Sequence, residues 1–206
     1  MNRCLICMSA LDEGVTLKEY LFEEDIICGH CRHRFIKNDR IYTYKNLKVH
    51  AFYQYDDFME SLLYQFKEGR DVALADVFLW KQRKKMVDIF RQHQCVIMPS
   101  SKEKLESRGF HHLKKILACS KVEICDCFIK TKNYKQSLQR AQNREKIHSI
   151  MQFSFFPEKD FYLFDDVVTS GNTLLAAASL LRKKEEMIEA YVLSVHPRFV
   201  EICDKQ

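Results

Sequence analysis

The sequence lacks several features that define large classes of proteins. No apolar run approaches the roughly 20 residues of a membrane-spanning helix, and residues 1–14 lack the long apolar stretch of a secretory signal. There is no G-x-x-x-x-G-K-[ST] segment, which binds nucleoside triphosphates, and no G-x-G-x-x-G segment, which binds dinucleotides. Glycine and proline are scarce, at five and three of 206 residues, and we find no internal repeat or low-complexity linker. These absences leave a cytoplasmic globular protein as the expectation.

What the sequence does contain is enough for one ordinary domain with a small appendage. Hydrophobic residues make up 47% of the chain, and 15 phenylalanines can fill a sizeable core. The net charge of +5 is mild. It permits contact with nucleic acid without being an argument for it.

The nine cysteines include two C-x-x-C pairs near the N-terminus, Cys4 with Cys7 and Cys28 with Cys31. Two residues between thiolates let both sulfurs reach one tetrahedral ion, and four thiolates leave no position open for water. The pattern therefore predicts a structural zinc site in a knuckle of residues 1–36, with His30 and His33 next to the ligands or solvated. A redox C-x-x-C motif or chance pairing is the alternative.

From residue 37 onward, candidate strands and helices alternate, which predicts an α/β domain with an open parallel sheet flanked by helices over residues 37–206. After a hairpin over 40–57, we expect helices over 57–69, 71–93, 108–120 and 171–186. A helix or mobile loop is expected over 137–150. Strands are expected over 95–99, 122–129, 151–156, 160–166 and 189–195. Ligands of such sheets bind at the carboxyl ends of the strands, so the loops after Pro99 and Asp166 should share one rim.

The segment 160–175, DFYLFDDVVTSGNTLL, combines a buried strand with two adjacent carboxylates and a polar loop. Backbone N–H groups at a helix N-terminus bind anions, and Gly171 lets the backbone approach a phosphate closely. Carboxylates accept hydrogen bonds from sugar hydroxyls and can hold Mg²⁺. A ribose 5-phosphate would satisfy both halves of the segment, whereas an acidic strand end with ordinary helix caps is the alternative.

This segment resembles the phosphoribosyl-pyrophosphate (PRPP) motif of type I phosphoribosyltransferases. The resemblance implies that Asp165 and Asp166 contact ribose hydroxyls and that PRPP binds with Mg²⁺. It also implies that the following loop cradles the 5′-phosphate through Val167, Thr169, Ser170, Gly171, Asn172 and Thr173.

The order of motifs along nearly the whole chain resembles the ComF family, phosphoribosyltransferase-like proteins associated with competence for DNA uptake. The motifs are the paired cysteines, YDDFMESLLYQFKEGRD, VIMPSSKEKLESRGF, QSLQRAQN and DDVVTSGNT. The resemblance implies a loop that meets the pyrophosphate, with Ser100, Ser101, Lys102 and Arg108. This sequence departs from the family pattern in V-I-M-P and in His111 and His112 after R-G-F.

The resemblance implies a PRPP-binding protein that acts in DNA uptake during natural competence and contacts single-stranded DNA and a helicase-like competence ATPase. Basic stretches at 81–85 and 130–146, together with Tyr42, Tyr44 and Tyr55, suit a single strand, although they equally suit a solvated helix face and core rings. The alternative is an active phosphoribosyltransferase of nucleotide metabolism, with an acceptor that the sequence does not identify. The candidate cations of the second basic stretch, for DNA or for closing over the leaving group, are Lys130, Lys132, Lys135, Arg140 and Arg144.

Overall fold

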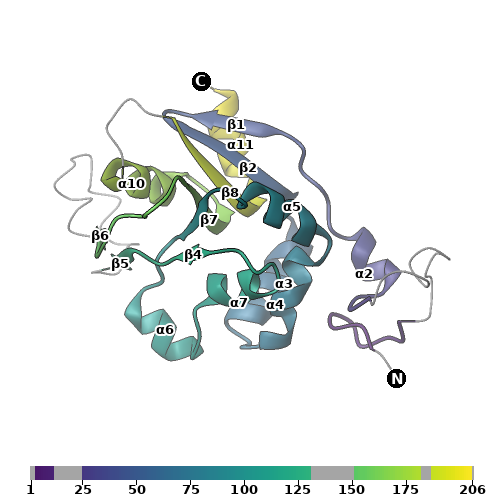
Figure 1. Cartoon of the computed structure of the whole chain (residues 1–206). Helices are drawn as coiled ribbons and strands as arrows, with labels where there is room; N and C mark the ends of the chain where they lie inside the picture. Colours follow the sequence, from purple (N-terminus) through teal and green to yellow (C-terminus); the bar gives the residue numbers. More distant parts are fainter. Residues whose placement is uncertain (1–2, 12–24, 131–150, 182–186, 206) are drawn as a thin grey trace.

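The structure, a computed structural model, describes residues 3–11, 25–130, 151–181 and 187–205. Its centre is a six-stranded mixed sheet in the order β1-β2-β8-β7-β3-β4 (Figure 1). The two central strands, β8 and β7, are mainly apolar and are buried along most of their length. The strands are β1 (Ile41–Tyr44), β2 (Leu47–Gln54), β3 (Gln94–Ile97), β4 (Ile124–Cys125), β7 (Phe161–Val168) and β8 (Ile188–Val195).

The α/β prediction is confirmed, with one correction at the edge of the sheet. All neighbouring pairs of this sheet are parallel except β1 with β2, which is antiparallel. Only Lys45 and Asn46 join β1 to β2, and a two-residue connection cannot make the crossover that parallel strands need. The expected hairpin is therefore present, and it ends the parallel order.

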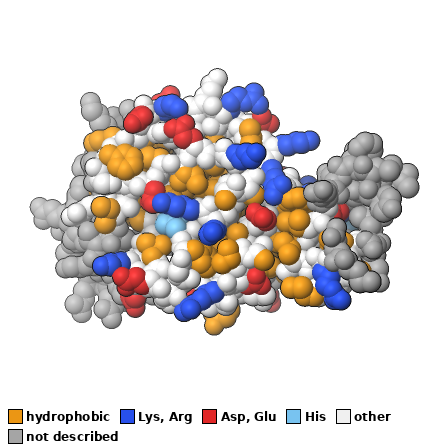
Figure 2. All heavy atoms as spheres, turned by 60° about the horizontal axis from the view of Figure 1, so that its bottom comes forward, with side chains coloured by type: hydrophobic (Ala, Val, Ile, Leu, Met, Phe, Trp, Pro, Cys, Tyr) orange, Lys and Arg blue, Asp and Glu red, His pale blue; other side chains and the backbone are white. Residues whose placement is uncertain are grey.

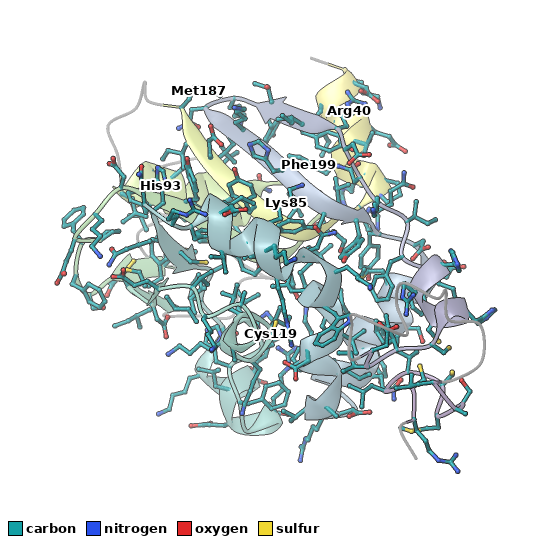
Figure 3. The ribbon with its side chains drawn as sticks, turned by 45° about the vertical axis from the view of Figure 1, so that its right-hand side comes forward. Arg40, Lys85, His93, Cys119, Met187 and Phe199 are labelled. Atoms are coloured by element: carbon teal, nitrogen blue, oxygen red, sulfur yellow. The ribbon has the colours of Figure 1, made fainter. Side chains whose placement is uncertain are left out.

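Helices cover both faces of the sheet. On one face Phe199 of α11 (Pro197–Asp204) packs against Tyr42 and Tyr44 of β1 (Figure 3). On the other face Phe90, which follows α5 (Arg83–Ile89), packs against Tyr191 of β8. The remaining helices are α2 (Gly29–His33), α3 (Asp57–Lys67), α4 (Ala75–Leu79), α6 (Lys102–Arg108), α7 (His112–Ala118) and α10 (Asn172–Leu181).

The single helix expected over 71–93 is wrong. The segment is divided into η1 (Val72–Leu74), α4, η2 (Trp80–Gln82) and α5. Neither proline nor glycine marks the divisions, and the buried residues Leu79, Met86 and Phe90 keep a helical spacing. Only the tertiary packing bends this segment, because α4 lies against α7 whereas Phe90 reaches the sheet.

Two other expectations also need correction. Residues 102–108, expected as part of a loop, form α6, which Ser101 caps and Gly109 ends with a φ of 81°. The single strand expected over 122–129 is divided into β4, in the main sheet, and β5 (Phe128–Lys130). β5 pairs antiparallel with β6 (Met151–Phe153) in a separate two-stranded sheet. The helix or loop expected over 137–150 lies outside the described residues.

The N-terminal residues join the domain through the edge of β2. Ile36 and Asn38 precede β1 in the chain and bond to β2 through their backbone. The N–H of Gln54 donates to the Ile36 carbonyl at 2.8 Å, and the N–H of Asn38 donates to the Phe52 carbonyl at 3.0 Å. This places α2 beside α3 and α4, at the right-hand side of Figure 1. Within the described ranges, none of the helices has the length and apolarity that crossing a membrane requires.

Candidate functional site

The four paired cysteines lie together in the folded chain. One sulfur from each of Cys4, Cys7, Cys28 and Cys31 lies within 4.8 Å of the others, and the Cys7 and Cys28 sulfurs are 3.6 Å apart. Tetrahedral zinc with Zn–S bonds of about 2.3 Å separates its sulfurs by about 3.8 Å. A hydrogen bond with the Ser9 hydroxyl lowers the pKa of Cys7 to about 6, which favours the thiolate that a metal needs. The cluster could hold a metal ion and fits a structural zinc site.

The acidic pair lies near the carboxyl end of β7. Asp165 is partly buried and Asp166 is buried. Each carboxylate is fixed by the next backbone amide, since Asp165 Oδ1 accepts from the N–H of Asp166 and Asp166 Oδ1 from the N–H of Val167, both at 2.9 Å. One oxygen of each acid lies within 4.8 Å of the other and of a His112 nitrogen. This group of three could hold a divalent cation, the carboxylate oxygens being suited to Mg²⁺.

Two residues from other elements converge on Asp166 Oδ2. Lys67, at the end of α3, forms an ion pair with it, and His112 Nε2 of α7 lies 3.6 Å away. His112 Nδ1 is 3.2 Å from the Ser100 hydroxyl. The loop after β3 and the carboxyl-terminal half of β7 therefore meet through His112 at one rim of the sheet, as expected for neighbouring parallel strands.

Burial shapes the charges of this cluster. It lowers the pKa of Lys67 to about 8, against the attraction of the Asp165 carboxylate, and it lowers the pKa of His112 well below 6.5, reinforced by the Lys67 charge. His112 is therefore neutral at pH 7, and its contact with Ser100 positions it beside Asp166. Lys67 is protonated and positively charged at pH 7, and it loses this charge as the pH rises through about 8.

The residues expected to meet the pyrophosphate are divided between this cluster and the surface. Arg108 is buried and donates to Glu68 Oε1 at 2.5 Å, which lowers the pKa of Glu68. The Ser101 hydroxyl accepts from the N–H of Lys104 as the cap of α6. The Lys102 side chain is 88% exposed and lies 3.8 Å from Glu106, so the structure does not bring Lys102 to the acidic pair.

The loop between β7 and α10 has the conformation that only glycine adopts easily. Gly171 has a φ of 70°, and a Cβ there would lie 2.8 Å from Phe199 and 3.1 Å from Tyr44. Gly171 is thus required by the left-handed backbone and by the packing of α11, in addition to any close approach of a phosphate. Thr169 and Asn172 are exposed, whereas Ser170, Thr173 and Val167 are partly buried.

Sequence reasoning missed Lys67 and Glu68, which bring charges into the cluster from the end of α3. Both lie in the segment YQFKEG, where a lysine followed by an acid and a glycine reads as an ordinary helix end. The buried Phe66 immediately before Lys67 was the available signal, because it indicates that this end of the helix faces the interior. No local pattern identifies the partner of Lys67.

The basic residues proposed for DNA lie largely beyond the part of the chain that the structure describes. Lys130 ends β5, and its side chain is among those not described. Lys132, Lys135, Arg140 and Arg144 fall within 131–150, outside the described residues. On the face shown in Figure 2, lysine and arginine side chains are scattered between hydrophobic and acidic ones. Of the tyrosines, Tyr42 and Tyr44 pack against Phe199, as core rings do.

Comparison with known proteins adds an independent finding. No family model matches the chain. Competence protein ComFC of Bacillus subtilis (strain 168) is 24% identical to it over 221 aligned positions, which cover 88% of this chain and 89% of that protein. This similarity over most of both chains, together with the four-cysteine cluster, confirms the resemblance of the chain to the ComF family.

Proposed function

We propose that this protein binds PRPP, or a similar phosphoribosyl ligand, together with Mg²⁺ at the carboxyl end of β7, and acts in DNA uptake during natural competence. The observation that carries the ligand proposal is the convergence of Asp165, Asp166, Lys67 and His112 beside the Gly171 loop. The similarity to competence protein ComFC supports the role in competence. The location we propose is the cytoplasm.

In this proposal each group of the ligand has a chemically suitable counterpart. Carboxylate oxygens of Asp165 and Asp166 accept hydrogen bonds from ribose hydroxyls. Backbone and hydroxyl donors of residues 167–173 bind the 5′-phosphate, aided by the N-terminus of α10. Lys67 and Arg108 supply positive charge near the pyrophosphate, with Ser100 and Ser101 as further donors.

The Mg²⁺ that accompanies PRPP would be held by Asp165 and Asp166, whose oxygens lie close enough together. It would neutralise charge on the pyrophosphate. The chain's own residues orient the ligand, because Ser100 fixes His112 and Lys67 fixes Asp166. His112 is neutral and faces Asp166, which suits a positioning residue.

Calorimetric titration tests the ligand proposal. PRPP with Mg²⁺ should bind more tightly than ribose 5-phosphate or ATP, because PRPP combines the ribose, the 5′-phosphate and the pyrophosphate. Asp165→Asn should weaken PRPP binding at least tenfold, since hydrogen bonds to charged groups contribute roughly 1.5–3 kcal/mol each. Asp160→Asn is the matched control, because Asp160 is exposed just before the opposite end of the same strand. Equal affinity for all three ligands contradicts the proposal.

The role in DNA uptake includes contact with single-stranded DNA and with a helicase-like ATPase, for which the cysteine knuckle offers a platform. The competing function is an active phosphoribosyltransferase of nucleotide metabolism. Release of pyrophosphate from PRPP in the presence of a nucleobase acceptor would favour the enzyme. PRPP binding without release, combined with binding to single-stranded DNA, would favour the competence protein.

A further inference from the structure

His112 approaches the acidic pair at a distance that suits a shared metal ion. Its Nε2 lies 3.6 Å from Asp166 Oδ2, which is longer than a hydrogen bond. One ligand atom of each of His112, Asp165 and Asp166 lies within 4.8 Å of the other two. Nitrogen and oxygen ligands bind divalent transition-metal ions at about 2.0–2.2 Å, which separates neighbouring ligand atoms by about 2.9–3.6 Å. The contact of His112 with Asp166 therefore fits two ligands of one ion better than it fits a hydrogen bond.

The His112 ring is fixed by contacts on its other sides. Its Nδ1 lies 3.2 Å from the Ser100 hydroxyl, and when Nδ1–H donates to that hydroxyl the lone pair is on Nε2. Histidine ligands of metals usually donate their other ring N–H to such a partner. The ring also lies parallel to that of His111, with 4° between the planes and 5.5 Å between the centroids. At 8% exposure, His112 has the surroundings of an oriented ligand.

Asp166 Oδ2 is a buried oxygen whose contacts are electrostatic. Within the described part of the chain it accepts no hydrogen bond, and the Lys67 ammonium lies against it in an ion pair. A carboxylate oxygen that faces an ammonium and an imidazole in this way is already placed to bind a cation. We therefore expect a metal ion and the Lys67 ammonium to compete for this oxygen.

The set of ligand atoms decides which ion suits the site. Mg²⁺ takes oxygen ligands and is usually held by one or two carboxylates together with substrate phosphates. Imidazole is a ligand of transition-metal ions, and histidine combined with carboxylate and open positions is typical of Fe²⁺ sites. The four thiolates of the knuckle, by contrast, suit zinc. His112 is one of the two histidines by which this sequence departs from the family pattern, so the imidazole is a feature of this chain.

We propose that His112, Asp165 and Asp166 form a site for a divalent transition-metal ion of the Mn²⁺ and Fe²⁺ class, which binds to the protein before any phosphoribosyl ligand. Three protein ligands leave coordination positions for water or for phosphate oxygens. The inference deepens the proposed function, on which it rests for the role of the ion but not for its binding, because all three ligands belong to the protein.

Mn²⁺ alone, added to the zinc-loaded full chain, tests the site. The EPR signal of free Mn²⁺ should reveal about one bound ion per chain, held more tightly than Mg²⁺. Pulsed EPR of the bound ion should show coupling to a nitrogen nucleus, which carboxylates cannot provide. His112→Gln should remove this coupling and weaken Mn²⁺ binding by roughly tenfold or more, with far less effect on Mg²⁺. His93→Gln, the same change in an imidazole that stacks on Tyr162 outside this site, is the control and should leave both unchanged.

A second variant tests the competition for Asp166. Lys67→Met removes the ammonium and should tighten Mn²⁺ binding, whereas unchanged affinity would overturn Asp166 Oδ2 as a ligand. Nitrogen coupling that persists in His112→Gln would assign the ion to another histidine and overturn the site.

The wild type alone decides the central point, so the test does not depend on the folding of a variant. No Mn²⁺ binding in the absence of PRPP, bound Mn²⁺ without nitrogen coupling, or tighter binding of Mg²⁺ would each overturn the inference. Titration of PRPP with Mg²⁺ separates it from the proposed function. PRPP binding without Mn²⁺ binding contradicts the inference alone, and nitrogen-coupled Mn²⁺ without PRPP binding contradicts the proposed function alone.

Discussion

Replacing Asp166 with Asn should destabilise the protein strongly, whereas replacing Asp165 with Asn should change its stability little. Asp166 forms a buried ion pair with Lys67, the two side chains being 10% and 18% exposed. Asp166→Asn leaves the Lys67 charge buried without that carboxylate. Asp165 is only partly buried, and an Asn amide oxygen in its place can still accept from the N–H of residue 166.

The magnitude follows from the burial of the pair. Removing one partner of a buried ion pair costs about 3–5 kcal/mol. For a chain of this size, 1 kcal/mol corresponds to roughly 2–4 °C in Tm, so the Tm of Asp166→Asn should be roughly 6–20 °C lower. Replacing both partners, in Lys67→Met/Asp166→Asn, should recover most of the loss, because neither buried charge remains.

Urea denaturation of the wild type, of Asp166→Asn, of Lys67→Met and of the double variant measures the coupling between Lys67 and Asp166, with Asp165→Asn as the comparison. PRPP affinity measured on the folded variants should fall in every variant that lacks an acid of the pair. Two results would refute the reasoning. One is an Asp166→Asn variant as stable as the wild type, and the other is a double variant no more stable than Asp166→Asn, since either shows that the two charges do not stabilise each other.

The remaining predictions concern the metal, the pH dependence, the glycine loop and the basic segment. Elemental analysis should find about one zinc per chain, lost in Cys4→Ser or Cys28→Ser but kept in Cys95→Ser or Cys203→Ser, and full zinc in a Cys4/Cys28 double variant would contradict the site. PRPP affinity should be constant below pH 8 and fall by up to tenfold per pH unit above it. The reason is that Lys67, whose pKa is about 8, loses its proton and its positive charge in that range. Calorimetry at pH 7 and pH 9 measures this fall, which should disappear in Lys67→Arg. Gly171→Ala should lower the Tm more than Gly109→Ala, because both have positive φ but only the first places a Cβ against Phe199. Charge reversal at Lys132, Lys135 and Arg140 should weaken DNA binding and flatten its salt dependence, and an unchanged slope would return these residues to the solvated surface.

The parts of the fold that the sequence predicted are those with a local signal. The strand 160–166, the two carboxylates at its end and each C-x-x-C pair consist of residues that are close together in the sequence, so their spacing alone indicates their local geometry. The central position of β7 also follows from the unbroken apolar run of residues 161–164 at its start, which is typical of a parallel strand buried on both faces.

The parts that the sequence could not predict depend on contacts between distant segments. The division of residues 71–93 leaves the helical spacing of the apolar residues intact, so only the packing of α4 on α7 reveals it. The ion pair of Lys67 with Asp166 joins residues 99 positions apart. From the sequence, two adjacent carboxylates are expected to repel each other. Lys67 reverses that expectation for Asp166.

The same ion pair gives the proposed site a charge balance that bears on how it would bind a polyanion. Three negative charges, on Asp165, Asp166 and Glu68, oppose two positive charges, on Lys67 and Arg108. Both positive charges are already engaged in ion pairs, Lys67 with Asp166 and Arg108 with Glu68. The cluster therefore has no excess of positive charge with which to attract PRPP. A ligand that brings its own Mg²⁺ adds that charge, and ribose hydroxyls that bond to Asp166 let the Lys67 ammonium turn its remaining donors toward phosphate. On this argument, affinity for PRPP without Mg²⁺ should be weak even though every residue of the site is in place.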